Sequence, residues 1–339
     1  MKHLLSILLL ALLFGCSPRL EMPPLTVNLG FRGADVTENG DLFVAGQAGK
    51  VYFLPSGAQQ WKDISPEGYD STEFRDAYWN KKKQSFLVMG ISSPGVLLEY
   101  SLKKENWTNV FRSSHPNIFM DGIAGNSERT FVYGDPLDST WFLLSDDGNF
   151  EHWETQHLPL NPISGEAGFA ASGSGLIVQK DQLILASGGK QSGLYIWNWE
   201  DSTKTQFSVF PYDTLSSSGI FSIAENPKTG AVVAVGGDYL RPNTRTNTAF
   251  IWQNGTIQAS DSGAFGYRSS VIFHQQMAFC SGRNGVDIST DGGLHWLPFS
   301  DLPFYRLLSL HNGVLGIGKN GSIYLFENTT IEKFVSELE

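Results

Sequence analysis

Phe43-Val44-Ala45-Gly46 is the stretch that decides the fold, because it is a short apolar run stopped by a glycine and the chain repeats it. The spacings between successive glycines are 44, 44, 54, 48, 46 and 36 residues. This near-constant period indicates an array of one structural unit. The further runs end at Gly90, Gly134, Gly188, Gly236, Gly282 and Gly318.

Each run belongs to a group of strand-like segments. One segment precedes the run, as residues 31–36 precede the first, and another follows the glycine, as residues 50–54 do. A shorter fourth segment is often preceded by a tryptophan. Four short antiparallel strands in each of seven units predict an all-β, seven-bladed β-propeller, with residues 27–339 as one domain. The tryptophans are Trp61, Trp107, Trp153 and Trp296.

Two details of this ring are predicted as well. Residues 166–169 are expected to begin the fourth unit, and the 21 residues from Ala167 to Gly188 mark an insertion there. The ring is expected to close through residues 323–326, or through an N-terminal strand near residues 25–29 that joins the last blade.

The first residues have the pattern of a lipoprotein signal peptide. Lys2 and His3 precede an apolar stretch that ends in Leu13-Phe14-Gly15-Cys16, which resembles a bacterial lipobox. The stretch is too short to span a bilayer. We therefore predict cleavage of residues 1–15, a lipid on Cys16 and a tether over residues 16–26. The residue directly after Cys16 is not Asp, which favours the outer membrane and a domain that faces the periplasm.

Composition narrows the classes of partner. The net charge is −10 and no basic stripe is present, which argues against nucleic acid. The seven histidines are scattered, so no metal site is predicted. Cys280 has no partner once Cys16 is lipidated, and it is expected to be a buried apolar residue. We expect a monomer without a cofactor.

The predicted ring brings polar residues to one end of its axis. First strands line the channel of a propeller, so the residues that begin them neighbour the residues that follow the second-strand glycines. We call this end the channel mouth. Its expected members are Arg32, Arg75, Asp121, Asp135, Glu166, Asp238, Tyr239, Tyr267, Arg268, Arg283, Tyr305 and Arg306.

Arginines recur at equivalent positions of units one, two, six and seven, which are consecutive in a closed ring. Acidic residues face them from units three and four. Guanidinium groups bind carboxylates with two parallel hydrogen bonds, so one interpretation is a pocket for a carboxylate or a C-terminal peptide. The other is that arginines and acids pair with each other and only fill the channel. The arginines are Arg32, Arg75, Arg268 and Arg306.

Residues 289–296 match the Asp-box pattern Ser-x-Asp-x-Gly-x-x-Trp of sialidase-type propellers (BNR repeats). Ser and Asp side chains in such a segment tie down a turn, here between the third and fourth strands. The tryptophan is expected to pack between blades. A partial copy lies at residues 145–149, followed by Trp153. The pattern residues are Ser289, Asp291, Gly293 and Trp296.

With these motifs the chain resembles the photosystem II stability and assembly factor-like propellers, and most of all their bacterial lipoprotein branch. The resemblance covers residues 31–325. It implies noncatalytic binding of a partner polypeptide during assembly of a membrane complex, with the four arginines as the docking surface. Its most specific stretches are Met120-Asp121-Gly122-Ile123, Gly134-Asp135-Pro136, residues 165–173, residues 217–222, Gly236-Gly237-Asp238-Tyr239 and Tyr267-Arg268-Ser269.

Two enzymatic interpretations compete with binding. Members of that branch are often labelled oxidoreductases, but no dinucleotide fingerprint follows a strand and opens a helix here. A sialidase-like glycoside hydrolase, or a carbohydrate-binding propeller, shares the Asp-box and the arginine cluster. A nucleophile and an acid could come from a set of tyrosines and acidic residues, yet no spacing identifies them: Tyr267, Tyr305, Glu166, Asp121 and Asp135. We therefore predict a binding protein and keep the hydrolase as the alternative.

Overall fold

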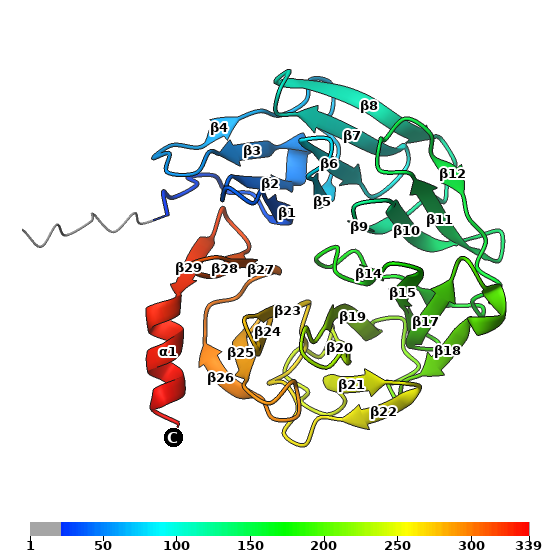
Figure 1. The fold of residues 1–339 in the computed structure, drawn as a ribbon, viewed down its shortest axis with the longest axis vertical. Coiled ribbons are helices and arrows are strands. Elements are labelled where there is room, and N and C mark those ends of the chain that lie inside the picture. Colours follow the sequence, from blue (N-terminus) through cyan, green and yellow to red (C-terminus); the bar gives the residue numbers. More distant parts are fainter. Residues whose placement is uncertain (1–21, 339) are drawn as a thin grey trace, which may run out of the picture.

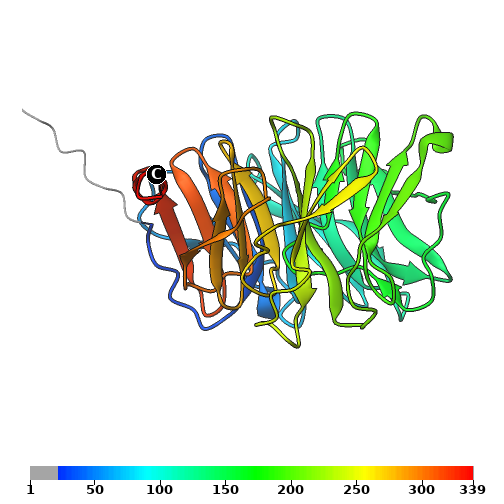
Figure 2. The same cartoon turned by 90° about the horizontal axis from the view of Figure 1, so that it is seen from below.

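The computed structural model describes residues 22–338, which form a ring of seven antiparallel sheets around a central axis (Figure 1). Figure 2 shows the ring from the side, with the strands running between its two faces. The predicted seven-bladed β-propeller is confirmed.

Blades one to three are four-stranded sheets in which strands adjacent in sequence pair in order. Blade one contains β1 (Phe31–Val36), β2 (Leu42–Gly46), β3 (Val51–Leu54) and β4 (Lys62–Asp63). Blade two contains β5 (Phe74–Asn80), β6 (Ser85–Gly90), β7 (Gly95–Ser101) and β8 (Asn106–Ser113). Blade three contains β9 (Met120–Gly125), β10 (Thr130–Leu137), β11 (Thr140–Asp146) and β12 (Glu154–Thr155).

Blades four to six repeat this order. Blade four contains β14 (Leu176–Val178), β15 (Gln182–Ala186), β17 (Gly193–Asn198) and β18 (Gln206–Val209). Blade five contains β19 (Ser218–Glu225), β20 (Val232–Asp238), β21 (Ala249–Gln253) and β22 (Thr256–Ala259). Blade six contains β23 (Ser270–His274), β24 (Met277–Gly282), β25 (Gly285–Ser289) and β26 (Leu297–Ser300).

Blade seven has three strands, where the repeat predicts four. The helix α1 (Asn328–Ser336) follows it directly, and its Ile331 and Phe334 side chains pack against blades six and seven. The short strands β13 (Glu166–Ala167) and β16 (Gly188–Gly189) extend the sheet of blade five beyond β19. The remaining elements are β27 (Arg306–Leu310), β28 (Gly313–Ile317), β29 (Ile323–Glu327), α1 (Asn328–Ser336) and the 3-10 turns η1 (Gln47–Gly49) and η2 (Ser202–Lys204).

The repeated glycines have a common steric cause. A Cβ on Gly46 would lie 2.3 Å from the carbonyl oxygen of Gly30, and one on Gly134 would lie 2.1 Å from that of Phe119. In both blades the backbone of the residue just before the first strand passes directly over the end of the second strand. A side chain cannot fit there, so the run ends at glycine.

The core lies between the blades. Each seam between neighbouring blades holds one apolar cluster, so the inner strands are buried on both faces. For example, Phe43 of blade one stacks on Phe86 of blade two with ring centroids 4.3 Å apart. Strands buried in this way read as continuous apolar runs, which is why the repeat is visible in the sequence.

The ring closes without a shared sheet, and both predictions for its closure are wrong. Residues 25–29 form no strand, and β29 pairs only with β28. Two backbone hydrogen bonds link the terminal blades, from Phe31 N–H to the Gly318 carbonyl (3.2 Å) and from Gly321 N–H to the Leu29 carbonyl (2.8 Å). An apolar cluster that includes Leu25 also holds the first and last blades together.

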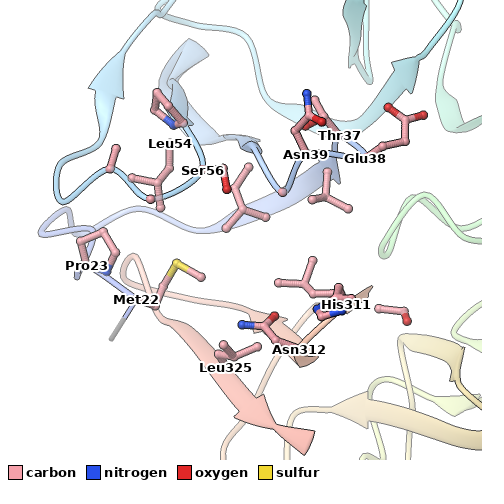
Figure 3. Close-up of a pocket in the computed structure, with 18 residues that line it drawn as sticks. Met22, Pro23, Thr37, Glu38, Asn39, Leu54, Ser56, His311, Asn312 and Leu325 are labelled. Carbon is pink, nitrogen blue, oxygen red and sulfur yellow. The ribbon is translucent and has the colours of Figure 1, made fainter. Parts of the chain in front are cut away.

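A cavity of about 730 Å³ remains at this seam (Figure 3). Met22, Leu54 and Leu325 line it together with the β1–β2 and β27–β28 turns. Those turns lie at the opposite end of the first strands from Arg32 and Arg306, so the cavity is on the face away from the channel mouth.

Candidate functional site at the channel mouth

Residues 168–175 run into the ring axis, and we call them the channel loop. The prediction that residues 166–169 begin the fourth blade is wrong, because the first strand of that blade is β14. In Figure 1 the segment before β14 reaches toward the centre of the ring. The insertion expected in the fourth unit is thus the loop that fills the axis.

Beta-bulges aim the mouth side chains. The pairing of the first and second strands shifts register at the mouth end of blades one, two, three and five. Such a bulge carries one unpaired residue and re-aims its side chain. This common local geometry explains why these positions in the repeat share a location. The four extra residues are Arg32, Arg75, Asp121 and Phe221.

Arginines from three blades hold the channel loop by its carbonyl groups. Arg32 Nη1 donates to the Ala171 carbonyl oxygen at 2.8 Å, and Arg75 Nη1 donates to that of Ala170 at 3.2 Å. Arg306 donates to the Ser172 carbonyl oxygen. Part of the donor capacity of these arginines therefore serves the fold.

The four repeat-equivalent arginines do not form one patch. Arg268 is fully buried and its guanidinium pairs with Asp287 at 2.6 Å. Arg306 pairs with Asp76, which is also buried. Only Arg32 and Arg75 line the cavities at the mouth. The interpretation of internal pairing thus describes Arg268 and Arg306, whereas the other two arginines remain available at the mouth.

Two adjoining cavities open at the mouth, with volumes of about 450 and 570 Å³. Both contain Arg32 and Arg75. Tyr305 lines the larger one, where its ring lies 3.9 Å below the Arg32 guanidinium carbon. The smaller one, which we call the mouth pocket, is lined among others by Asp135, Phe169, Phe221, Tyr239, Tyr267 and Arg283.

Carboxylate partners are scarce among these arginines. Arg75 Nε pairs with Glu73 at 2.9 Å. Within residues 22–338, no carboxylate lies at salt-bridge distance from Arg32 or Arg283, and Arg283 Nη1 instead donates to the Tyr239 carbonyl oxygen at 3.1 Å. Burial, and then the nearby charge of Arg75, lower the pKa of Arg32. An anion in the pocket would relieve this unbalanced charge.

The acidic side of the mouth contains two of the three predicted residues. Asp135 accepts a hydrogen bond from Gly168 N–H at 2.9 Å, and burial raises its pKa to about 6. Asp121 lies fully buried under the channel loop, and no hydrogen bond of normal geometry reaches either carboxylate oxygen. Burial first, and then Asp135, raise the pKa of Asp121 well above its usual value.

Glu166 and Asp238 have structural partners instead. Glu166 is buried and accepts hydrogen bonds from the Ser187 hydroxyl (2.5 Å) and the Tyr195 hydroxyl (2.9 Å). It does not line the mouth pocket, so it forms no nucleophile pair with Tyr267 or Tyr305 there. Asp238 pairs with Arg241 at 2.6 Å and orders the loop that carries Tyr239.

Tyr239 and Tyr267 were predicted from the sequence as mouth residues, whereas the two phenylalanines of the pocket, Phe169 and Phe221, were missed. Phe169 of the channel loop stacks on Phe221 with centroids 3.9 Å apart and planes 11° apart. Both were interpreted as ordinary strand residues. The signal that points to Phe169 is the lengthened spacing of the fourth unit, because an inserted segment need not lie in a strand.

The turn at residues 289–296 has the geometry expected of its pattern. Asp291 accepts hydrogen bonds from the Ser289 hydroxyl (2.9 Å) and from His295 N–H (3.0 Å). Gly293 N–H donates to the Ser289 hydroxyl oxygen at 2.8 Å. Trp296 is buried against blade five. In blade three Asp146 accepts from Phe150 N–H at 2.6 Å and ties the equivalent turn.

Other predicted features lie away from the mouth. Cys280 is buried, and burial raises its thiol pKa well above the usual value. Cys16 and the leader are outside the described residues. Across residues 22–338, no group of three or more His, Cys, Asp or Glu residues is placed to hold a metal ion. None of the helices in that range is long and apolar enough to cross a membrane.

Fold and mouth together define a seven-bladed β-propeller with a polar and aromatic pocket at one end of its axis. No known sequence family and no curated protein matches the chain. Its fold is similar to that of YCF48 bound to a D1 peptide, with a TM-score of 0.62 and 11% identity over 90% of this chain and 96% of that one.

Two further solved structures have the same fold. YCF48 from Cyanidioschyzon merolae gives a TM-score of 0.60 at 16% identity, over 90% of this chain and 98% of that one. A chain of the mitotic checkpoint complex gives 0.61 at 15% identity, over 97% of both chains. At these identities the comparisons establish the propeller fold alone.

Proposed function

We propose that the protein is a monomeric, lipid-anchored binding protein that holds a polypeptide partner at its channel mouth, in the manner of an assembly factor for a membrane complex. The observation that carries this proposal is the arginine group of the mouth pocket. Arg32 and Arg283 face a cavity of about 450 Å³ without a carboxylate partner among the described residues. Guanidinium groups in that state favour an anionic ligand.

The structural neighbours give this proposal its class of ligand. YCF48 has been solved bound to a D1 peptide, and its fold aligns with 90% of this chain. A peptide supplies carboxylates from its side chains or its C-terminus. None of these structural neighbours gives the glycoside hydrolase comparable support. Of its candidate acids, Glu166 is hydrogen-bonded away from the mouth pocket and Asp121 is fully buried. Asp135 shares the pocket with Tyr267, where it accepts a hydrogen bond from Gly168 N–H of the channel loop.

The test is photo-crosslinking from the mouth of the full-length, membrane-anchored protein in its own cells. Changing Arg32, Arg75 and Arg283 to Gln should abolish specific crosslinked polypeptides. The lost hydrogen bonds to the channel loop should lower the melting temperature, but the variant should stay folded at the temperature of the experiment. Arg112→Gln is the matched control, because this arginine is exposed on the outer strand β8. Arg268 is left intact, since removing it would leave a buried, unpaired Asp287.

An unchanged set of crosslinked partners in the triple variant would overturn the proposal. The same cells test the anchor, because a Cys16→Ser variant should lose both lipid labelling and membrane association. Retention of that variant in the outer-membrane fraction would contradict the lipid anchor and leave the mouth site to be judged by its crosslinks.

A further inference from the structure

Four aromatic rings gather at the channel mouth in a cluster of their own. Phe221 lies at its centre and stacks on Phe169 at 3.9 Å. Tyr267 approaches Phe221 edge-on at 4.8 Å, and Tyr239 does so at 6.2 Å. Ala171 completes the group. We call these residues the aromatic cluster.

Ring packing does not account for this cluster. The propeller has seven seams, and each already holds one apolar cluster between adjacent blades. The aromatic cluster is an eighth among the described residues, and it joins the channel loop to blades five and six. Phe169 and Tyr239 stay half-exposed and line the mouth pocket beside Arg32, Arg75 and Arg283.

We propose that the aromatic cluster is a side-chain subsite of the mouth pocket, which takes an aromatic or long aliphatic side chain next to a carboxylate bound by the arginines. This rests on the proposed function and adds what the peptide must contain. A volume of about 450 Å³ accommodates two or three residues of an extended peptide. The carboxylate comes from a chain end or from an Asp or Glu side chain, which present the same chemistry.

The subsite is held in place before any ligand arrives. Asp135 accepts from Gly168 N–H, and Arg75 and Arg32 donate to the carbonyls of Ala170 and Ala171, so both sides of Phe169 are fixed. A Cβ on Gly168 would lie 2.2 Å from a carboxylate oxygen of Asp121, which requires glycine at that point. A preformed pocket loses little conformational entropy when a ligand binds.

Fluorescence polarisation with the full-length protein in detergent tests the subsite. The probe is fluorescein-labelled Gly-Ser-Gly-Ala-Phe with a free C-terminus. Replacing its Phe by Ala should weaken binding at least tenfold, because a buried aromatic side chain is lost. Two further peptides identify the source of the carboxylate: the C-terminal amide of the probe, and an amidated peptide with an internal Glu-Phe pair.

Protein variants separate the two parts of the pocket. Phe169→Ala and Tyr239→Ala should each weaken the Phe peptide at least fivefold and bring its affinity close to that of the Ala peptide, whereas Arg75→Gln should weaken both peptides. Tyr324→Ala is the control, because this tyrosine is exposed on β29, away from the mouth. The melting temperature of each variant shows whether it is folded.

Equal affinity of wild-type protein for the Phe and Ala peptides overturns the subsite, as does wild-type affinity in both aromatic variants. If Arg75→Gln still weakens these peptides, the proposed function survives and only the subsite fails. If none of the peptides binds, the subsite is overturned. Unchanged crosslinking in the triple arginine variant separately overturns the mouth as a binding site.

Discussion

Asp121 is a fully buried carboxyl group without a normal hydrogen-bond partner. A second acidic residue, Asp135, lies close to it. Burial and Asp135 both raise its pKa. The native state therefore binds this proton more tightly than the unfolded chain, whose Asp pKa is about 3.9. Stability is lost as the pH rises from that value through the higher native pKa.

Asp121→Asn should remove this loss, because the amide has the same shape and cannot ionise. We expect the variant to be more stable than wild type at pH 8, with the difference shrinking toward pH 4. Thermal unfolding across this pH range measures it. Asp301→Asn, at an exposed position, should change nothing. If wild type is instead the more stable protein at pH 8, the prediction is wrong, and Asp121 is ionised and stabilised by its surroundings.

Equivalent positions in a repeat acquire different roles from their neighbours. Arg32 and Arg268 both lie near the start of a blade. Arg268 meets Asp287 of β25 and becomes a buried ion pair, whereas Arg32 meets the ring of Tyr305 and a loop carbonyl. Because the partner comes from another strand or blade, the role of each arginine depends on the tertiary arrangement.

The channel loop is the element on which the mouth depends. Gly173 has a φ of +70°, and a Cβ there would lie 2.0 Å from the carboxyl carbon of Asp76. A side chain at this position must displace either the loop or the Asp76–Arg306 pair. The loop then loses the geometry that holds Phe169 in the mouth pocket.

Gly173→Ala should therefore destabilise the protein by more than the backbone cost of a left-handed alanine, which is roughly 1–2 kcal/mol. Gly57→Ala is the matched control, since its φ is +75° and nothing lies within 4 Å of the added Cβ. Urea unfolding compares the two. Equal losses of unfolding free energy would mean that the channel loop yields without strain.

The seam between the first and last blades is held by packing and two backbone hydrogen bonds, because no loop of the chain joins these two blades as it joins blades that are consecutive in sequence. Leu25 is 7% exposed there and belongs to the cluster formed with Leu308, Leu315 and Ile317. The two linking backbone hydrogen bonds are few compared with a shared strand. The seam should be the place where the ring opens first.

Leu25→Ala should cost about 2–5 kcal/mol, as expected for a large core side chain that leaves a cavity. Amide hydrogen exchange should accelerate in β1 and β28 before it does in blades three to five. Leu240→Ala, at a residue 69% exposed, should stay within about 0.5 kcal/mol of wild type. If Leu25→Ala behaves like this control, closure does not depend on that contact.

Much of the fold was predictable because its signals are local. Residues 31–36 were expected as a strand that precedes the first run, and the structure has β1 (Phe31–Val36) there. The turn at residues 289–296 was equally readable, since its hydrogen bonds join residues at most four positions apart. The first strand of blade four was misplaced because an insertion breaks the period.

The sequence alone determined the number of blades and the strands of the regular repeats, and it placed Arg32, Arg75 and Asp135 at the same end of the ring. Repeated burial between blades imposes the period, and close backbone approach at the ends of second strands such as β2 and β10 imposes the glycine. Only the tertiary structure decided which arginines stay available, where the channel loop runs and how the ring closes. Those outcomes rest on contacts between distant residues, such as Arg32 with Ala171, 139 positions away, and Arg306 with Asp76, 230 positions away.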